Sequence, residues 1–352
     1  MIGLLTFHNS NNFGSLLQTY GLYRKVTELG FDCEVIDYRC DAHERSQVPH
    51  LPKLRKNLYL YIVNWLRNPL RLKYNSLQKF LRTQMKVSSK CDKKSISKLT
   101  NKYSQILVGS DLVWDMSIQD GDLTYFLDFE SSGLKKIAFA SSIGFPWEEK
   151  DKLIIKPLLG EFRHIAVRES LSADWVEELI GKRPPVVCDP TLLLTKDEWM
   201  TFVKPDDHPE KYVLVYFETD NNDCINTAIA YARKHNLKVK RIEYGLSTEY
   251  ERVLPYSIND FLSLIYNAEL IVTASYHGIL FSLYFNKPLI YFLRRQTSRV
   301  DTLVEKLGIG ECNGHKMKNR TNLPMMDYDK INQAIDAYRI FSVNCLKKEL
   351  TV

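Results

Sequence analysis

Short apolar runs alternate with segments of helical periodicity along most of the chain. Apolar runs of about four to eight residues that end in small or polar residues are typical of buried parallel strands. In the first part of the sequence such runs cover residues 2–7, 33–38, 104–111, 135–142, 164–170 and 184–190. Residues 15–30 have apolar positions at helical spacing, with Ser15 near the predicted N-cap and Gly30 at the stop. This alternation predicts a parallel sheet with helices on both faces.

A second series of the same kind follows a polar, proline-bearing seam at residues 195–210. Its apolar runs cover residues 211–217, 237–242, 270–275 and 288–292. A chain of 352 residues exceeds the usual size of a single core, which favours two domains. We therefore predict an α/β protein with two Rossmann-like, doubly wound domains facing a cleft. The predicted ranges are 1–200 for the first domain, 205–325 for the second and 326–352 for a C-terminal helix.

Positive charge is concentrated in one part of the first domain. The net charge of the chain is +6, but residues 51–105 hold fourteen Lys and Arg against one Asp, a local charge of +13. Leucines and aromatic residues are interleaved with these cations, a pattern typical of amphipathic helices at an anionic membrane surface. We predict a basic helical insertion at about residues 44–103, and a solvated helical face remains the alternative. Nucleic acid is not expected as a partner, because no recognised binding motif accompanies the charge.

The seven cysteines are scattered and none is spaced as CxxC. This pattern indicates reduced thiols in a cytoplasmic protein and predicts no metal site. The longest apolar run, residues 58–66, is much shorter than a bilayer crossing. We therefore expect a cytoplasmic protein, with peripheral attachment to the inner face of the cell membrane as an open alternative.

Polar residues at strand ends are the first candidates for a ligand site, because open α/β sheets bind ligands beyond the carboxyl ends of their strands. In the first domain these candidates are Asn9, Asn12, Ser110 and Asp111. They can both donate to and accept from hydroxyl groups, which suits a sugar. The asparagines could instead cap the following helix. No GxGxxG follows a strand, and no P-loop is present.

His277 lies where the apolar run of residues 270–273 gives way to helical spacing. Its neighbours Ser275, Tyr276 and Gly278 complete a predicted strand-to-helix junction. A helix N-terminus binds anions through its free N–H groups, and a histidine there can also move a proton. The alternative is a buried histidine with a purely structural role.

Several segments together carry a resemblance to a known family. They read GLLTFHNSNNFGSLLQTYGL, VGSDLVW, YFLDF, KKIAFASSIG, VRES, VVCDPTLLL and TASYHGILFSLYFNKPLIYF, in this order between Met1 and Gly308. The sequence thereby resembles the polysaccharide pyruvyl transferase family. Two positions depart from the common pattern: Leu112 stands where many members have Gln, and Tyr276 where many have Phe or Arg. These departures bear on subgroup and acceptor more than on class.

The resemblance implies a fold similar to that of the two-domain GT-B glycosyltransferases. It also implies transfer of pyruvate from phosphoenolpyruvate onto a sugar as a ketal. The partners would be phosphoenolpyruvate and a sugar or lipid-linked oligosaccharide acceptor. No cofactor and no metal are expected.

The chemistry of such a reaction can be assigned to particular residues. It needs a proton donor and a base, and His277 can serve as both. Arg168, at the end of a predicted strand, suits the carboxylate or phosphate of the donor because its planar fork binds oxyanions. The second domain would bind the donor through Ser275, Tyr276, Gly278, Lys287, Arg295 and Arg299, with Arg294 as a further cation, although each of the later cations could equally lie on the surface. The first domain would bind the acceptor through Asn9, Asn12, Ser110 and Asp111.

Two alternatives from other classes remain. A GT-B glycosyltransferase that uses a nucleotide sugar would share the architecture. A non-catalytic glycan-binding protein would not depend on His277 for any measurable property.

Overall fold

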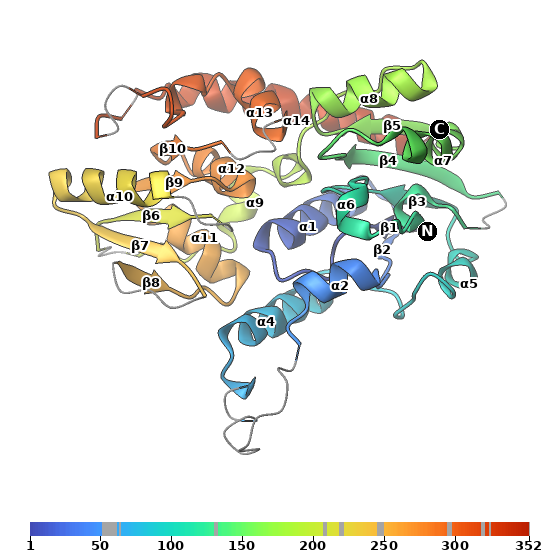
Figure 1. Cartoon of the computed structure of the whole chain (residues 1–352), viewed down its shortest axis with the longest axis horizontal. Helices are drawn as coiled ribbons and strands as arrows, with labels where there is room; N and C mark the ends of the chain where they lie inside the picture. The colour runs from blue at the N-terminus through green and yellow to red at the C-terminus, as the bar shows by residue number, and fades with distance from the viewer. Residues whose placement is uncertain are drawn as a thin grey trace. The chain divides into compact units, whose positions relative to one another are not determined.

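The computed structural model describes residues 1–50, 62, 65–129, 133–206, 210–217, 222–244, 250–293, 298–317, 321–323 and 325–351. It divides into two compact units. Unit 1 comprises Met1–Lys56, Tyr74–Leu194 and Tyr338–Val352, and unit 2 comprises Asn57–Lys73 and Thr195–Ala337. Each unit contains one parallel five-stranded sheet, as Figure 1 shows. Two doubly wound α/β sheets are therefore confirmed.

The sheet of unit 1 has the order β2-β1-β3-β4-β5. Its strands are β1 (Ile2–Leu5), β2 (Cys33–Val35), β3 (Gln105–Val108), β4 (Lys135–Ser141) and β5 (His164–Val167). Its helices are α1 (Phe13–Glu28), α2 (Asp41–Gln47), α5 (Ile96–Thr100), α6 (Met116–Gln119), α7 (Glu149–Gly160) and α8 (Ser170–Ile180). Short 3₁₀ turns occupy η1 (Thr124–Phe126) and η2 (Pro190–Leu193).

Helices cover both faces of this sheet. Side chains alternate between the faces of a strand, so Ile106 and Val108 point to one side and Gln105 to the other. Ile106 and Val108 belong to a core cluster with Ile155 of α7. Gln105 Nε2 donates to the carbonyl of Leu350 in the C-terminal helix, at 3.3 Å.

The sheet of unit 2 has the order β10-β9-β6-β7-β8. Its strands are β6 (Tyr212–Tyr216), β7 (Lys238–Ile242), β8 (Glu251–Val253), β9 (Leu270–Thr273) and β10 (Leu289–Tyr291). Its helices are α9 (Lys196–Met200), α10 (Asn222–His235), α11 (Ile258–Tyr266), α12 (Tyr276–Tyr284) and α13 (Ser298–Leu307), with the turn η3 (Gly310–Cys312). Val213 and Val215 pack with α10 residues on one face, and the ring of Tyr216 meets Phe261 of α11 on the other.

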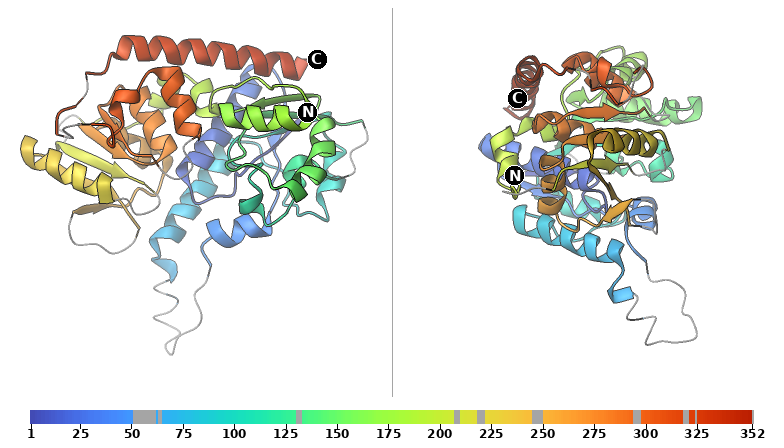
Figure 2. Two further views of the ribbon diagram at one scale, coloured as in Figure 1. Left: turned by 45° about the horizontal axis from the view of Figure 1, so that its top comes forward. Right: turned by 90° about the vertical axis from the view of Figure 1, so that its left-hand side faces the viewer.

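Two helices contain residues of both units. They are α4 (Pro69–Gln84) and α14 (Tyr328–Thr351), and Figure 2 shows α14 as one continuous helix in red. The last part of α14 is tied into unit 1. Ser342 Oγ accepts from the backbone N–H of Cys188 at 2.9 Å, and Arg339 Nε donates to the carbonyl of Leu192 at 2.8 Å.

The predicted elements need four corrections. Residues 184–190 form no strand, and only Val186 makes an isolated bridge to Val167. The short edge strand β8 was not predicted. The N-cap of α1 is Asn12 rather than Ser15. The basic insertion is not purely helical, because residues near Val87 and Cys91 add bridges beside β2. Residues 51–61 and 63–64 of that insertion lie outside the described residues.

All seven cysteines are described, and none of them forms a disulfide. Within the described part of the chain, no helix is both long and apolar enough to cross a bilayer.

Candidate active site

Unit 1 has a topological switch point between β1 and β3. From β1 the chain moves to β2 on one side and returns to β3 on the other. The connections that leave β1 and β3 at their carboxyl ends therefore diverge, and in open α/β sheets such a crevice binds the ligand. These connections hold the predicted residues Asn9, Asn12, Ser110 and Asp111.

Unit 2 has an equivalent switch point between β6 and β9. From β6 the chain moves to β7, and it later returns to β9 on the opposite side. The connection after β9 is two residues long and leads directly into α12. His277 is the second residue of that helix, so the structure places it at the switch point.

The start of α12 is built around His277. The helix begins after Ser275, whose hydroxyl accepts from the backbone N–H of Gly278 at 3.4 Å. His277 is 7% exposed, and its ring makes an edge contact with Tyr276 at a centroid distance of 5.4 Å. No acidic residue lies in the first turn. The positive end of the helix dipole and the imidazole together suit an anionic ligand.

Gly278 allows α12 to begin close to the sheet. A Cβ atom at this position would lie 2.5 Å from Thr273 Oγ1 and 3.1 Å from Tyr216 Cδ1. The Thr273 hydroxyl also donates to the carbonyl of Tyr216, which links the ends of β9 and β6. A larger residue would therefore displace either the helix start or this link, and the position of His277 with it.

The predicted donor-binding cations behave differently from one another. The guanidinium of Arg299, in the first turn of α13, lies 5.7 Å from the ring centroid of Tyr276, so it is a neighbour of the His277 region. Arg294 and Arg295 lie outside the described residues. Lys287 is wrongly assigned. It follows the C-terminal end of α12, at the amino edge of the sheet, and its ammonium lies 5.2 Å from the ring centroid of Tyr266.

Both predicted asparagines of unit 1 are engaged with protein groups. Asn12 Oδ1 accepts from the backbone N–H of Gly14 at 2.7 Å, which is the N-cap bond of α1. The amide of Asn9 donates to Glu44 at 2.9 Å and its oxygen accepts from Tyr74 at 2.7 Å. In this conformation the asparagines shape the loop after β1.

Ser110 and Asp111 lie at the end of β3. Ser110 is fully buried, and its Oγ has no hydrogen-bond partner among the described residues. The Asp111 carboxylate accepts from the Ser15 hydroxyl at 2.7 Å and from the backbone N–H of Leu112 at 3.0 Å. Its side chain is 12% exposed. Asp111 is thus an oriented carboxylate that can still be reached at the switch point.

Arg168 is buried in a group of carboxylates. Its side chain has no exposed surface, and Nη1 donates to Asp189 Oδ2 at 2.7 Å. Nη2 lies 3.5 Å from Asp111 Oδ1, and Nε lies 3.9 Å from Glu169 Oε2. A substrate oxyanion cannot reach the guanidinium in this arrangement. The buried guanidinium of Arg168 therefore holds the carboxylate of Asp111 in position. This role differs from the predicted direct contact with the donor.

The sequence analysis missed a second ionic network beside the same loop. His8 Nε2 lies 3.0 Å from Asp37 Oδ1, and Arg39 Nε lies 2.6 Å from the same oxygen. Burial alone would raise the pKa of Asp37, but the hydrogen bonds from His8 and Arg39 outweigh it and hold the pKa well below its usual range. Asp37 lies near the end of the predicted strand 33–38 and Arg39 follows it, so the strand-end rule could have found them.

His43 of α2 was also missed. Its ring stacks on Phe7 at a centroid distance of 4.4 Å. Burial lowers the pKa of His43 to about 4, although the charge of Asp111 opposes the shift. His43 is therefore a neutral ring near Asp111 at neutral pH.

The model of the family described as Polysaccharide pyruvyl transferase matches residues 12–295. The chain belongs to the polysaccharide pyruvyl transferase family. The resemblance of its motifs to this family is thus confirmed, and the matched range includes Asn12, Ser110 and Asp111 of unit 1 and His277 of unit 2. No curated protein matches the chain in sequence.

Solved structures show the fold to which this pyruvyl transferase family member is similar. The UDP-GlcNAc 2-epimerase from Neisseria meningitidis bound to UDP-GlcNAc has a TM-score of 0.50 and 9% identity, covering 97% of this chain and 93% of the epimerase. The heptosyltransferase WaaC from E. coli with ADP has a TM-score of 0.39 and 12% identity, covering 96% and 100%. MurG from Acinetobacter baumannii has a TM-score of 0.42 and 11% identity, covering 99% of each chain. The match to the epimerase and the two parallel five-stranded sheets show a fold of the GT-B type.

Proposed function

We propose that this chain transfers the pyruvyl group of phosphoenolpyruvate onto a pair of hydroxyls of one sugar as a cyclic ketal. The pathway would be the cytoplasmic synthesis of a bacterial-type cell-surface polysaccharide. The observation that carries the proposal is the position of His277 in the first turn of α12, at the switch point of unit 2, in a member of this family.

His277 would protonate the methylene carbon of the donor. The C2 carbon then gains oxocarbenium character, and a sugar hydroxyl attacks it. Phosphate leaves from C2, and the second hydroxyl closes the ring. Two hydroxyl protons are lost: one is balanced by the new methyl group and the other leaves with phosphate. The imidazole of His277 first gives a proton to the methylene carbon and then receives one from a sugar hydroxyl. A single histidine can therefore act as both acid and base.

The two ends of the donor would be held by different groups. The first turn of α12, with Ser275, Tyr276 and Gly278, offers N–H groups to an oxyanion, and Arg299 adds a positive charge beside Tyr276. Arg295 remains a predicted contributor. These groups neutralise the donor without a metal in this proposal.

The acceptor hydroxyls would be bound in unit 1. The oriented carboxylate of Asp111 can accept from a hydroxyl, whereas Ser110, which is fully buried, would only shape the wall behind this carboxylate. Asn9 and Asn12 would act by holding the loop after β1 in place. Arg168 would act as a positioning residue for Asp111.

The test is incubation of the protein with phosphoenolpyruvate and a panel of free and lipid-linked glycans, followed by mass spectrometry. A gain of one pyruvyl group with release of phosphate is expected, and a chelator should not reduce turnover. Transfer from a nucleotide sugar instead would identify a glycosyltransferase. Glycan binding that is independent of His277 and occurs without any transfer would identify a binding protein.

We further propose that Ile62 and residues 65–73 contact an anionic membrane surface, where a lipid-linked acceptor would be available. Large apolar side chains are exposed here, namely Ile62 (46%), Leu66 (50%), Leu70 (42%) and Leu72 (39%). Arg67 is exposed among them, and the guanidinium of Arg71 lies 5.5 Å from the ring centroid of Trp65. Exposed apolar side chains beside cations and an indole suit the interface of an anionic bilayer.

Vesicle sedimentation tests this contact. Binding should require anionic lipid and weaken with added salt, and the double variant Arg67→Gln with Arg71→Gln should lose about 1 kcal/mol per removed cation. The double variant Lys90→Gln with Lys98→Gln is the matched control, because it removes two exposed cations away from the apolar side chains. A wild-type protein that ignores anionic vesicles at low salt would contradict the proposal.

A further inference from the structure

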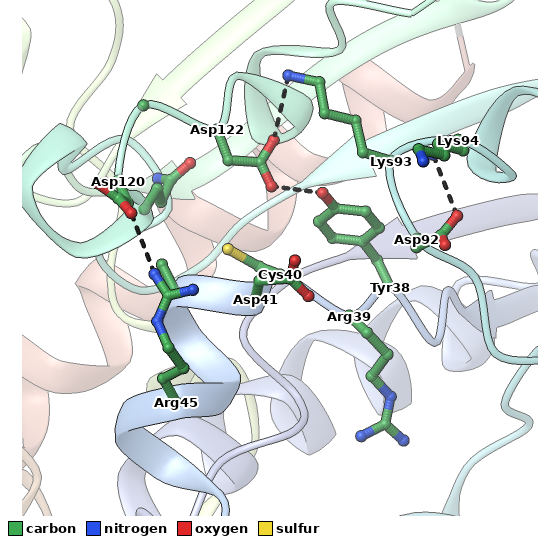
Figure 3. A pocket seen from close by; sticks show the side chains of 13 residues that line it. Tyr38, Arg39, Cys40, Asp41, Arg45, Asp92, Lys93, Lys94, Asp120 and Asp122 are labelled. Carbon is green, nitrogen blue, oxygen red and sulfur yellow. Dashed lines mark hydrogen bonds and ion pairs between the residues drawn. The ribbon is translucent and has the colours of Figure 1, made fainter.

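A cavity of about 480 Å³ lies beyond the carboxyl end of β2 in unit 1 (Figure 3). Its walls come from the residues that follow β2, from the start of α2, from residues 92–94 and from the loop 119–122. None of the residues proposed to act on phosphoenolpyruvate lines it. The volume is within the range of pockets that hold small ligands.

The charges that line the cavity nearly cancel. Its cations are Arg39, Arg45, Lys93 and Lys94, and its acids are Asp41, Asp92, Asp120 and Asp122. Arg45 pairs with Asp120 at 3.1 Å. Figure 3 shows the guanidinium of Arg39 turned away from the other side chains, consistent with its bonds to Asp37 and Glu44. An anionic ligand would therefore meet at least as many carboxylates as cations.

The floor of the cavity is fixed. The Tyr38 hydroxyl donates to Asp122, and Asp122 also accepts from the Thr124 hydroxyl at 2.7 Å. Burial and the bond to Asp122 raise the pKa of Tyr38 well above its usual range, so the phenol stays neutral. Lys93 Nζ lies 3.8 Å from Asp122 and 3.4 Å from Asp128, and it can offer its third N–H group to a ligand. A neutral ligand with many hydroxyls can donate to the carboxylates and accept from the cations without breaking these pairs.

Helix α2 links the cavity to the loop after β1. Asp41, Ala42 and Arg45 of this short helix line the cavity. His43 of the same helix stacks on Phe7, and Glu44 accepts from Asn9, both in the connection after β1. One short helix thus separates the cavity from the loop after β1, and His43 of this helix also lies near Asp111, the proposed acceptor-binding carboxylate.

We propose that this cavity binds a neutral sugar unit of the acceptor, away from the unit that receives the pyruvyl group. The acceptor is then an oligosaccharide recognised over several units. Its role as acceptor rests on the proposed function, but carbohydrate binding by the cavity does not.

Binding is measured first without phosphoenolpyruvate, on an array of neutral oligosaccharides of increasing length, and then by calorimetry with the best glycan and its shorter fragments. Wild-type affinity should rise with glycan length. Ala42→Trp, which fills the cavity, and Arg45→Ala, which removes a lining donor, should lower the affinity of the longer glycan by about tenfold or more, towards that of its fragment.

Two matched variants control for helix and charge effects. Ser46→Trp adds the same side chain to an exposed position of α2 that does not line the cavity, and Arg24→Ala removes an exposed helical arginine paired with Glu28 on α1. Both should bind the longer glycan like the wild type.

The outcomes separate the two proposals. If the cavity variants weaken glycan binding but the protein never transfers pyruvate, the proposed function is refuted and the cavity proposal is supported. Transfer with equal affinity for long and short glycans, or with full affinity in both cavity variants, overturns the cavity proposal alone. No binding of any array glycan by the wild type, or tight binding of inorganic phosphate in the cavity, also overturns it.

Discussion

The two switch points occupy equivalent places in their sheets but differ in chemistry. In unit 1, Asp111 is held by a hydroxyl, a backbone N–H and the buried Arg168. In unit 2, His277 stands in the first turn of a helix, and that turn holds no acidic residue. The first arrangement is a rigid set of donors and acceptors, and the second combines an imidazole ring with the positive end of a helix dipole.

This difference shows that topology sets the position of a site and local sequence sets its chemistry. The strand order places a loop at the carboxyl edge of each sheet, whatever its residues. The residues of that loop then decide whether the crevice suits hydroxyl groups or an anion. The following predictions test this division, from the largest expected effect to the smallest.

Loss of the imidazole should have the largest effect. His277→Ala and His277→Gln should lower kcat by roughly two to four orders of magnitude, as expected for a lost acid and base. The unfolding midpoint should change little. His50→Ala, at an exposed position of unit 1, is the control and should keep full turnover. A folded His277 variant with near-normal kcat would show that unit 2 does not supply the acid and base.

Arg168→Ala should act mainly on unit 1. It leaves Asp189 and Asp111 without their buried counter-ion, so the free energy of unfolding should fall by roughly 3–5 kcal/mol in urea titrations. Arg168→Lys should restore only part of this, because the charge returns without the planar fork. The exposed Arg183→Ala should leave the free energy of unfolding close to the wild-type value.

The same Arg168 variants distinguish positioning from direct contact. Positioning through Asp111 predicts a weaker apparent affinity for the acceptor, and Asp111→Asn should reproduce it. A stable Arg168→Ala protein that loses affinity only for phosphoenolpyruvate would instead support direct contact with the donor.

Gly278→Ala should disturb unit 2 without removing a functional group. The added Cβ meets Thr273 Oγ1, so either the helix start or the bond to Tyr216 must shift, at a cost of about 1–3 kcal/mol. Turnover should fall with it, because His277 is the preceding residue. Gly310→Ala is the matched control in unit 2, since its added Cβ would meet only Val304 at an ordinary 3.7 Å. Equal turnover in both variants would show that the position of α12 is not critical.

Glu349 should make the stability of unit 1 depend on pH. Burial raises the pKa of Glu349 to about 8, so folding favours its protonated form. The stability that the protonated Glu349 contributes is fully present below pH 4.5, the ordinary pKa of Glu, and is lost as the pH rises towards 8. Glu349→Gln should therefore raise the melting midpoint more at pH 8.5 than at pH 5.5. An equal shift at both values would contradict the assignment.

The parts of the fold that could be predicted are those with an apolar core on both sides. Residues 270–273 are fully buried in β9, and their apolar run followed by helical spacing located His277 correctly. The edge strand β8 has one polar face and no such run, so the pattern missed it. Most of residues 184–190 pack into unit 1, and their apolar run therefore resembles the pattern of a buried strand.

The candidate site was predictable in position more than in detail. The strand-end rule found Asp111 and His277 because it depends only on strand order and chain direction. It could not show that Arg168 is enclosed by three carboxylates, since Asp111 and Asp189 come from segments distant in sequence. Lys287 was misplaced because closeness in sequence was taken as closeness in space, although α12 lies between it and His277.

The return of α14 to unit 1 has a consequence for the order of events during synthesis. Ser342 and Leu350 supply bonds to Cys188 and Gln105, residues made about 150 to 250 positions earlier. Unit 2 is encoded almost entirely before these residues, so it can fold while unit 1 still lacks its last helix. On the ribosome, the part of the chain made first is therefore the part completed last.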